Sequence, residues 1–350
     1  MNQIYGSSNT GNLSEATRGI HNPDLLIMMS NAKQFDKHVE ELGKLFPGVP
    51  SIGCIGMSYE KGVCTEGVGV TAFTGVTVAT GALTSVSTMP AKDIKEYEEK
   101  MRSVKPGSKN TVCIDLCTGN DAAVLSTVGT VLAKSGVQLV GGTGDGGKVC
   151  ANGQIYDDAD VYAFVKNNGG KVKVYKENVY RPMDEFRFIA SNTDRSKYYV
   201  GKLNGKSAKK VYMDSLGIPE SAISEQTFKN PLGKMIGNDM CIISLKEVSG
   251  EGLCCFRQVN DSDVLTLLEM RDIKEIVQDT IDKIRSDFSR VSGVYSINCV
   301  FRYLVFENNH MTGDYLKQMG SLGSHCGLVG FGEHNNDQFV NQTMTCVVFE

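Results

Sequence analysis

The sequence has 350 residues, a formal net charge of −4 and 41% hydrophobic residues, enough to bury one large core or two ordinary ones. The weakly acidic balance argues against a nucleic-acid binder, and no apolar run approaches the roughly 20 residues of a membrane-spanning helix. Eleven cysteines without an export signal or a paired metal-ligand spacing predict free thiols in the cytoplasm, with no metal and no cofactor.

The first twenty residues are polar and lack the apolar core of a signal peptide. Two interpretations of this segment stay open, a flexible tail or an edge segment of the fold. The domain division below treats residues 1–20 as a flexible N-terminal tail.

A unit of strand, amphipathic helix and returning strand recurs along the chain, and hairpin-like strands follow it. The first copy begins with the apolar run 24–30 and continues into a helix with apolar residues at helical spacing over 35–46. A Pro-Gly pair ends this helix, and the chain returns through residues 51–59. Because a strand that returns after a helix runs parallel to the first, each copy predicts a parallel pair of strands.

The second copy begins with the apolar run 111–119. Its helix ends at Gly136, and the returning strand leads into the glycine cluster 141–147. Two alternating runs then flank Asn-Gly-Gly at residues 168–170, which is a strong hairpin signal. These hairpins add antiparallel neighbours, so we predict mixed sheets.

A third copy lies at the end of the sequence. We predict a strand over residues 293–307, a helix over 315–322 and a return strand over 327–337. A looser fourth copy spans residues 240–288 and contains an amphipathic helix over 273–288.

The pattern changes after residue 179, and we place a domain boundary within residues 192–197. The sequence therefore predicts an α/β fold with two domains built from repeated β-α-β-hairpin units, in which helices flank mixed sheets. After the tail, the first domain covers residues 21–195 and the second covers residues 196–350.

Four motifs follow one another in the C-terminal half: YVGKLNGKSAKKVYMDSLG (199–217), FKNPLGKMIG (228–237), Cys299 with Arg302 in INCVFRY, and GFGEHNNDQFVNQTMT (330–345). In this order and spacing they resemble the C-terminal domain of FIST proteins. The N-terminal half, with GGTGDGG at residues 141–147, resembles the FIST N-terminal domain.

The resemblance implies a sensor in intracellular signal transduction that binds a small-molecule ligand, such as an amino acid or a similar metabolite. Relatives often carry such domains beside histidine kinases, chemotaxis receptors or cyclic-dinucleotide enzymes. The sequence shows none of these output modules, so we expect the sensor to act on a separate signalling protein of one of these kinds.

Arg302 and Glu333 are the first candidate ligand-binding residues, and we expect each near the end of a strand in the third copy. A guanidinium presents a planar fork to a carboxylate, and a glutamate accepts hydrogen bonds from an ammonium group. Held apart, the two would suit a zwitterion such as an amino acid. The alternative is that Arg302 and Glu333 pair with each other.

Asn341 and Thr343 are further candidates, because they alternate with Thr345 along one predicted strand and so share a face. Their side chains could bond a polar ligand or serve the strand and its turn. Cys299 lies three residues before Arg302, so the two face opposite sides of a regular strand. A buried structural cysteine is favoured there over a nucleophile, because no base has a recognisable spacing to it.

Gly142 and Asp145 come from the glycine cluster. Its spacing matches neither a P-loop nor a dinucleotide fingerprint, so a nucleotide cradle is disfavoured. A mobile loop bordering a ligand pocket and ordinary turn chemistry both stay open.

We predict that the chain is not an enzyme, since the sequence contains no G-x-S-x-G, H-E-x-x-H or P-loop motif. A sensor predicts a concave cavity with convergent polar groups. A ligand-free interaction scaffold predicts a filled pocket and an exposed apolar patch. A cysteine or carboxylate hydrolase is the weakest alternative.

Overall fold

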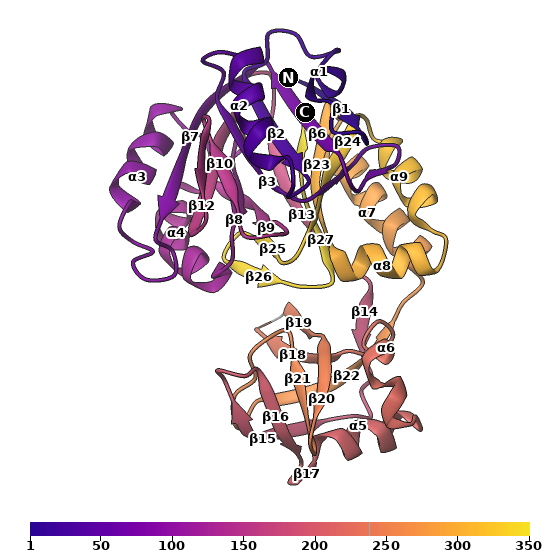
Figure 1. The fold of residues 1–350 in the computed structure, drawn as a ribbon. Helices are drawn as coiled ribbons and strands as arrows, with labels where there is room; N and C mark the ends of the chain where they lie inside the picture. Colours follow the sequence, from indigo (N-terminus) through magenta and orange to yellow (C-terminus); the bar gives the residue numbers. More distant parts are fainter. Residues whose placement is uncertain (238) are drawn as a thin grey trace. The chain divides into compact units, whose positions relative to one another are not determined.

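The computed structural model describes residues 1–237 and 239–350 (Figure 1). The chain divides into two compact units: unit 1 comprises Met1–Glu177 and Val277–Glu350, and unit 2 comprises Asn178–Ile276. Unit 2 is therefore an insertion in the sequence of unit 1. This division differs from the two consecutive domains that we expected, because the last strands of the chain pair with strands of the N-terminal half. The limits of the family domains stay a prediction.

Unit 1 contains three copies of one six-strand repeat. Repeat 1 comprises β1 (Asn2–Ser8), β2 (Leu25–Ser30), β3 (Ser51–Ile55), β4 (Met57–Tyr59), β5 (Val63–Cys64) and β6 (Val68–Thr74). Repeat 2 comprises β7 (Val76–Thr84), β8 (Thr111–Cys117), β9 (Gln138–Thr143), β10 (Val149–Ala151), β11 (Gln154–Tyr156) and β12 (Ala159–Asn167). Repeat 3 comprises β13 (Val172–Asn178), β23 (Gly293–Cys299), β24 (His325–Gly330), β25 (Glu333–Asn335), β26 (Gln338–Val340) and β27 (Thr343–Phe349), with unit 2 inserted after β13.

The second and third strands of each repeat are parallel neighbours: β2 with β3, β8 with β9, and β23 with β24. The sixth strand runs antiparallel beside the second. Helices connect the parallel strands: α2 (Phe35–Leu45), α4 (Asp121–Ser135), and the pair α8 (Val300–Asn308) and α9 (Thr312–Gly320). The three predicted β-α-β units are confirmed, as is the mixed α/β fold with helices flanking mixed sheets. The hairpin predicted around residues 168–170 is wrong, because β12 and β13 lie in different sheets.

Each repeat donates a hairpin to the sheet of the repeat before it. The β10–β11 hairpin pairs with β3, the β25–β26 hairpin with β9, and the β4–β5 hairpin with β24. The exchange is cyclic, because repeat 1 completes the sheet of repeat 3. Three six-stranded sheets of equivalent order result: β1-β6-β2-β3-β10-β11, β7-β12-β8-β9-β25-β26 and β13-β27-β23-β24-β4-β5.

One core fills the space between the inner faces of the three sheets. It takes every second side chain of each buried strand, such as Ile27 of β2, Ile114 of β8 and Ile297 of β23. The outer faces are covered by helices: α1 (Leu13–Ala16) with α2 on the β2 sheet, α3 (Ile94–Ser103) with α4 on the β8 sheet, and α8 with α9 beside β23 and β24 (Figure 1).

The N-terminal segment is an edge strand, so the prediction of a flexible tail over residues 1–20 is wrong. β1 pairs along its whole length with β6. Gln3 is buried and its side-chain amide donates to the carbonyl oxygens of Val294 at 2.9 Å and Ser324 at 3.1 Å. A polar side chain with buried backbone partners anchors the segment although its sequence is polar.

The predicted strand over residues 293–307 ends earlier, at Cys299, and α8 follows it. In α8 the side chains of Arg302, Val305 and Phe306 are buried, which is the spacing of one helix face. A continuous apolar run fits a buried strand and a buried helix equally well, and here it contains one of each.

Unit 2 holds strands from β14 (Tyr180–Pro182) to β22 (Val264–Met270) and the helices α5 (Ala208–Leu216) and α6 (Ile223–Gln226). Every pairing recorded between its described strands is antiparallel. The looser fourth β-α-β copy predicted over residues 240–288 is therefore wrong, although its helix is present as α7 (Ile273–Asp287). Among the described residues, no helix is both long and apolar enough to cross a membrane.

Candidate functional site

Four of the seven predicted site residues meet around the carboxyl group of Glu333, which is fully buried in β25. Thr343 donates to this carboxyl from its hydroxyl at 2.9 Å and from its backbone N–H at 3.3 Å. The thiol of Cys299 also bonds to it. Gly142 pairs with Glu333 across β9 and β25. Residues from two repeats therefore converge where the exchanged hairpin joins its new sheet.

Burial dominates the protonation of this group. It raises the pKa of Glu333 to about 8, although the bonds from Thr343 and Cys299 act in the opposite direction. Burial, followed by the carboxyl of Glu333, also raises the pKa of the Cys299 thiol well above its usual range. Since the thiolate is the reactive form of cysteine, this environment favours a structural Cys299 and argues against a nucleophile.

Gly142 is required by close packing. A Cβ atom at this position would lie 2.2 Å from the carbonyl oxygen of Gly332, which belongs to the backbone of the exchanged hairpin. We expect Gly142→Ala to lower the free energy of unfolding by about 1–3 kcal/mol through overpacking, measured by urea denaturation. Gly129→Ala is the matched control: its Cβ would meet open space in α4, so it should stabilise by about 0.5–1 kcal/mol. Equal effects of the two variants would contradict this explanation.

Arg302 lies apart from this group, in α8 and not in the strand that we predicted over residues 293–307. It follows the end of β23 by three residues, and Oδ1 of Asn298 in β23 accepts from its Nε at 2.9 Å. Its charge partner is Glu177 of β13, so the alternative of an Arg302–Glu333 pair is also wrong. The guanidinium stacks 4.5 Å from the ring centroid of Phe306.

Asn341 and Asp145 also lie apart from the Glu333 carboxyl. Asn341 is buried in the turn before β27, and Asp145 is exposed in the loop after β9. The backbone N–H of Asp145 donates to the carbonyl oxygen of Ile55 at 2.7 Å, which ties this loop to the end of β3. Whether any of the seven residues contacts a ligand stays a prediction.

A buried imidazole-carboxylate cluster, which the sequence analysis missed, lies one residue beyond Glu333. Nδ1 of His334 is 2.8 Å from Oδ2 of Asp115, and Nε2 is 3.0 Å from Oδ1 of Asp121. Burial alone would lower the pKa of His334, but the two carboxylates outweigh it and hold the pKa well above its usual value. The ring is thus a cation that clamps β25 to β8 and to the start of α4. In the sequence, this cluster is indicated by Asp115, a charged residue within the otherwise apolar run 111–117.

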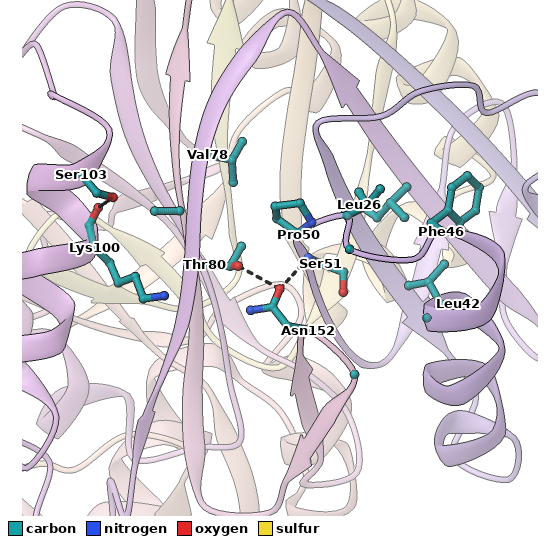
Figure 2. Close-up of a pocket in the computed structure, with 15 residues that line it drawn as sticks. Leu26, Leu42, Phe46, Pro50, Ser51, Val78, Thr80, Lys100, Ser103 and Asn152 are labelled. Carbon is teal, nitrogen blue, oxygen red and sulfur yellow. Dashed lines mark hydrogen bonds between the residues drawn. The ribbon is translucent and has the colours of Figure 1, made fainter.

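A cavity of about 570 Å³ opens on the outside of unit 1, between α2, the start of β3, β7 and α3 (Figure 2). One end is apolar, and the other is polar and approaches α3, where Lys100 and Ser103 lie (Figure 2). The apolar wall includes Leu42, Phe46, Val49, Pro50 and Val78.

Asn152 organises the polar end. This residue has φ of 51° and leads the two-residue β10–β11 turn, whose second residue is Gly153. Its Oδ1 accepts from the backbone N–H of Ser51 at 3.1 Å and from the hydroxyl of Thr80 at 2.9 Å, as the dashed lines in Figure 2 show. Because a backbone N–H fixes Oδ1 as the acceptor, the amide nitrogen Nδ2 remains a donor toward the cavity.

Lys100 supplies a positive charge to the same end of the cavity. Among the described residues, no carboxylate lies within ion-pair distance of its Nζ. A second cavity of about 300 Å³ shares Thr80, Lys100 and Asn152 with the first and adds the carboxylates of Asp93 and Glu96. Sequence reasoning missed this site because its walls come from separated segments of two repeats.

A family model, the FIST N domain, matches residues 24–206, which is more than half of the chain. The chain belongs to the FIST family. FIST domains are sensory domains of signal transduction. No curated protein matches the sequence significantly.

The FIST match begins just before β2 of repeat 1 and spans repeat 2, so it includes every residue that lines the cavity of Figure 2, from Leu26 to Gly153. Cys299, Arg302, Glu333, Asn341 and Thr343 lie outside the matched segment. The matched segment therefore contains the open cavity of Figure 2, whereas most residues of the buried group around Glu333 lie outside it.

Proposed function

We propose that this FIST protein is a sensor that binds a small carboxylate-bearing metabolite in the cavity of Figure 2 and signals to a separate protein. The observation that carries the proposal is the unpaired ammonium of Lys100 beside the free amide donor of Asn152, opposite an apolar wall. A concave, mostly apolar site with a few convergent polar groups is the usual form of a small-molecule site. An interaction scaffold without a ligand would instead fill this space with its own side chains.

An amino acid with an apolar side chain fits this arrangement best. Its carboxylate would accept from Lys100 and Asn152, and its side chain would lie against Leu42 and Phe46. The adjoining cavity offers the carboxylate of Glu96 to an ammonium group. The ligand class expected from the family resemblance is kept, but its site moves from Arg302 and Glu333 to repeats 1 and 2.

The test is isothermal titration of the full chain with leucine, phenylalanine and valine, each beside its amine analogue that lacks the carboxylate. A ligand at 100 times its Kd should also stabilise the protein by about 2.7 kcal/mol. We expect Lys100→Met to weaken binding by about 10- to 100-fold, the value of a charged hydrogen bond of about 1.5–3 kcal/mol. Lys95→Met, an exposed change in the same helix, is the control and should bind normally. Equal binding of the amine analogues, or full binding by Lys100→Met, would exclude the carboxylate site.

The output of the sensor is also part of the proposal. A histidine kinase, a chemotaxis receptor or a cyclic-dinucleotide enzyme is the kind of partner that FIST domains imply, and a cytoplasmic location suits all three. We further propose that residues 196–350 hold the FIST C-terminal domain, supported by the order of the four motifs between residues 199 and 345.

A further inference from the structure

A separate hollow, of about 450 Å³, lies in repeat 3 between α9, the β4–β5 hairpin and the start of β24. Gly313, Leu316, Lys317 and Gly320 line it, at the spacing of one helix face. A Cβ atom at either glycine would meet open space. The two glycines thus lower this face of α9 and leave room for a small molecule.

The hollow is the repeat 3 counterpart of the cavity in Figure 2. Both are lined by the helix that precedes the return strand and by the first residue of that strand, Ser51 in β3 and His325 in β24. Both also include the turn of the exchanged hairpin, with Asn152 in one and Glu60 and Lys61 in the other. The fold therefore builds a hollow at one position twice, with different chemistry in each.

His325 lines this repeat 3 hollow and has an unpartnered ring nitrogen. It is buried, its Nε2 lies 2.8 Å from the hydroxyl of Ser296, and its Nδ1 has no hydrogen-bond partner. Burial lowers the pKa of His325 to about 3, so the ring is neutral at physiological pH. A neutral imidazole has one N–H donor and one acceptor nitrogen.

The neighbouring bonds decide which nitrogen carries the proton. The hydroxyl of Tyr59 donates to the backbone carbonyl of Ser296 at 3.0 Å and lies 2.7 Å from the Ser296 hydroxyl. Because Tyr59 donates its single hydroxyl proton to this carbonyl, its oxygen must accept the hydroxyl proton of Ser296. The Ser296 oxygen must then accept from Nε2 of His325, so Nε2 carries the ring proton. Nδ1 is therefore a bare acceptor, buried without a donor, which is costly unless another group supplies one.

We propose that this hollow is a second binding site, for a small anion that also carries a hydrogen-bond donor, and that its occupancy is relayed from His325 to Glu177. The donor would satisfy Nδ1. The anionic group would lie toward Lys317, which has no carboxylate within ion-pair distance among the described residues. A 2-hydroxy acid is the simplest molecule with both groups.

The relay is a continuous line of buried bonds. Ser296 and Asn298 lie two residues apart on β23 and so face the same side. After the Ser296–Tyr59 bond, Nδ2 of Asn298 donates to the Tyr59 hydroxyl at 3.4 Å, and Oδ1 of Asn298 accepts from Arg302 at 2.9 Å. Arg302 pairs with Glu177, the last residue of unit 1 before the chain enters unit 2.

Unpartnered atoms stand at both ends of the relay: Nδ1 of His325 at one, and Nη1 of Arg302 with Oε2 of Glu177 at the other. The network already holds the proton on Nε2, so a donor at Nδ1 makes the Nε2–H group a stronger donor to the hydroxyl of Ser296. Buried hydrogen bonds polarise one another along such a chain. The free atoms at the far end allow the Arg302–Glu177 pair to take a second arrangement in response.

The binding test compares lactate with propionate, which differ by one hydroxyl group. We use the full-length Lys100→Met variant, so that carboxylate binding in the cavity of Figure 2 does not contribute. Long-range ¹H–¹⁵N spectra should show that lactate shifts the Nδ1 resonance of His325 and binds at least tenfold more tightly than propionate. Gly320→Met, whose side chain enters open space in the hollow, should remove this binding while the protein stays folded.

Equal affinities for lactate and propionate, an unmoved Nδ1 resonance, or full binding by Gly320→Met would each overturn the site. These results leave the amino-acid site untouched, because that site is tested separately through Lys100→Met and the amine analogues.

Hydrogen exchange tests the relay. On saturation with lactate, amide exchange of residues 177–180 should change at least twofold in the parent protein. The double variant Arg302→Met/Glu177→Met removes the far end of the relay and leaves the Tyr59–Ser296 bonds in place, so it should bind lactate at the hollow but show no such change. An identical response in the double variant, or no response in the parent, would overturn the relay.

Discussion

Arg302→Ala should lower the free energy of unfolding by about 3–5 kcal/mol, because it leaves the carboxylate of Glu177 buried without its cation. Arg302 is 1% exposed and Glu177 is 2% exposed, so water cannot replace the lost partner. The substitution also removes the bond to Asn298 and the stacking on Phe306. Urea denaturation followed by circular dichroism measures the change.

Arg102→Ala is the matched control. Arg102 pairs with Glu98 at 2.7 Å on the surface of α3, with side chains that are 69% and 37% exposed. Solvent screens this pair, so its loss should cost about 0.5 kcal/mol or less. Similar losses of unfolding free energy for Arg302→Ala and Arg102→Ala would show that the buried pair contributes no more to stability than the exposed pair.

The double variant Arg302→Met/Glu177→Met separates charge from packing. Replacing both charges by apolar side chains removes the unpaired carboxylate, so most of the stability lost in Arg302→Ala should return. If the relay is correct, this variant binds lactate at the His325 hollow yet shows no change in exchange at residues 177–180. The pair then serves to transmit the bound state more than to hold the fold.

The local periodicity of the sequence predicted the repeating part of the fold. Helix α2 follows its apolar spacing over residues 35–46, and the parallel strands around it follow from the strand-helix-strand order. The element that contains Arg302 was predicted wrongly because its apolar run fits the residue pattern of a buried strand and of a buried helix equally well. Only the burial of one side of α8 distinguishes the two.

The partners of the exchanged hairpins could not be predicted, because no local pattern specifies a strand far away in the chain. The bond between His334 and Asp115 joins residues 219 positions apart. Lys100 belongs to repeat 2 and lines one cavity together with Leu42 and Phe46 of repeat 1. The convergence of Cys299, Gly142 and Thr343 on Glu333 has the same origin, since three different strands supply them.

The repeats suggest why a sensor would use this fold. Each of the three sheets of unit 1 is completed by a hairpin of another repeat, so the position of each hairpin turn is coupled to two repeats at once. Both hollows lie against such a turn. A ligand that favours one position of the turn therefore also affects the packing of both repeats. Such a ligand binds one state of the protein more tightly than the other, and this difference in affinity is what shifts the equilibrium between the states.

Glu333→Gln should make the protein more stable at neutral pH, with a gain that grows as the pH rises. The pKa of Glu333 is about 8 in the folded protein and 4.5 as a free side chain. Because the folded pKa is raised, the stabilising contribution of this group is complete below pH 4.5 and is lost as the pH rises toward 8. Each pH unit in this window costs about 1.4 kcal/mol.

Glutamine keeps an acceptor oxygen for the hydroxyl of Thr343 but carries no ionisable proton. The difference in unfolding free energy between Glu333→Gln and the parent should therefore be small near pH 4.5 and reach about 3 kcal/mol by pH 7, then level off above pH 8. Urea denaturation at half-unit pH intervals measures this difference and cancels the titration of the other groups. Glu99→Gln, at an exposed position of α3, should give a flat difference over the same range. A flat difference for Glu333→Gln as well would show that its carboxyl ionises freely, and the buried contact with Cys299 and Thr343 would then have to open in solution.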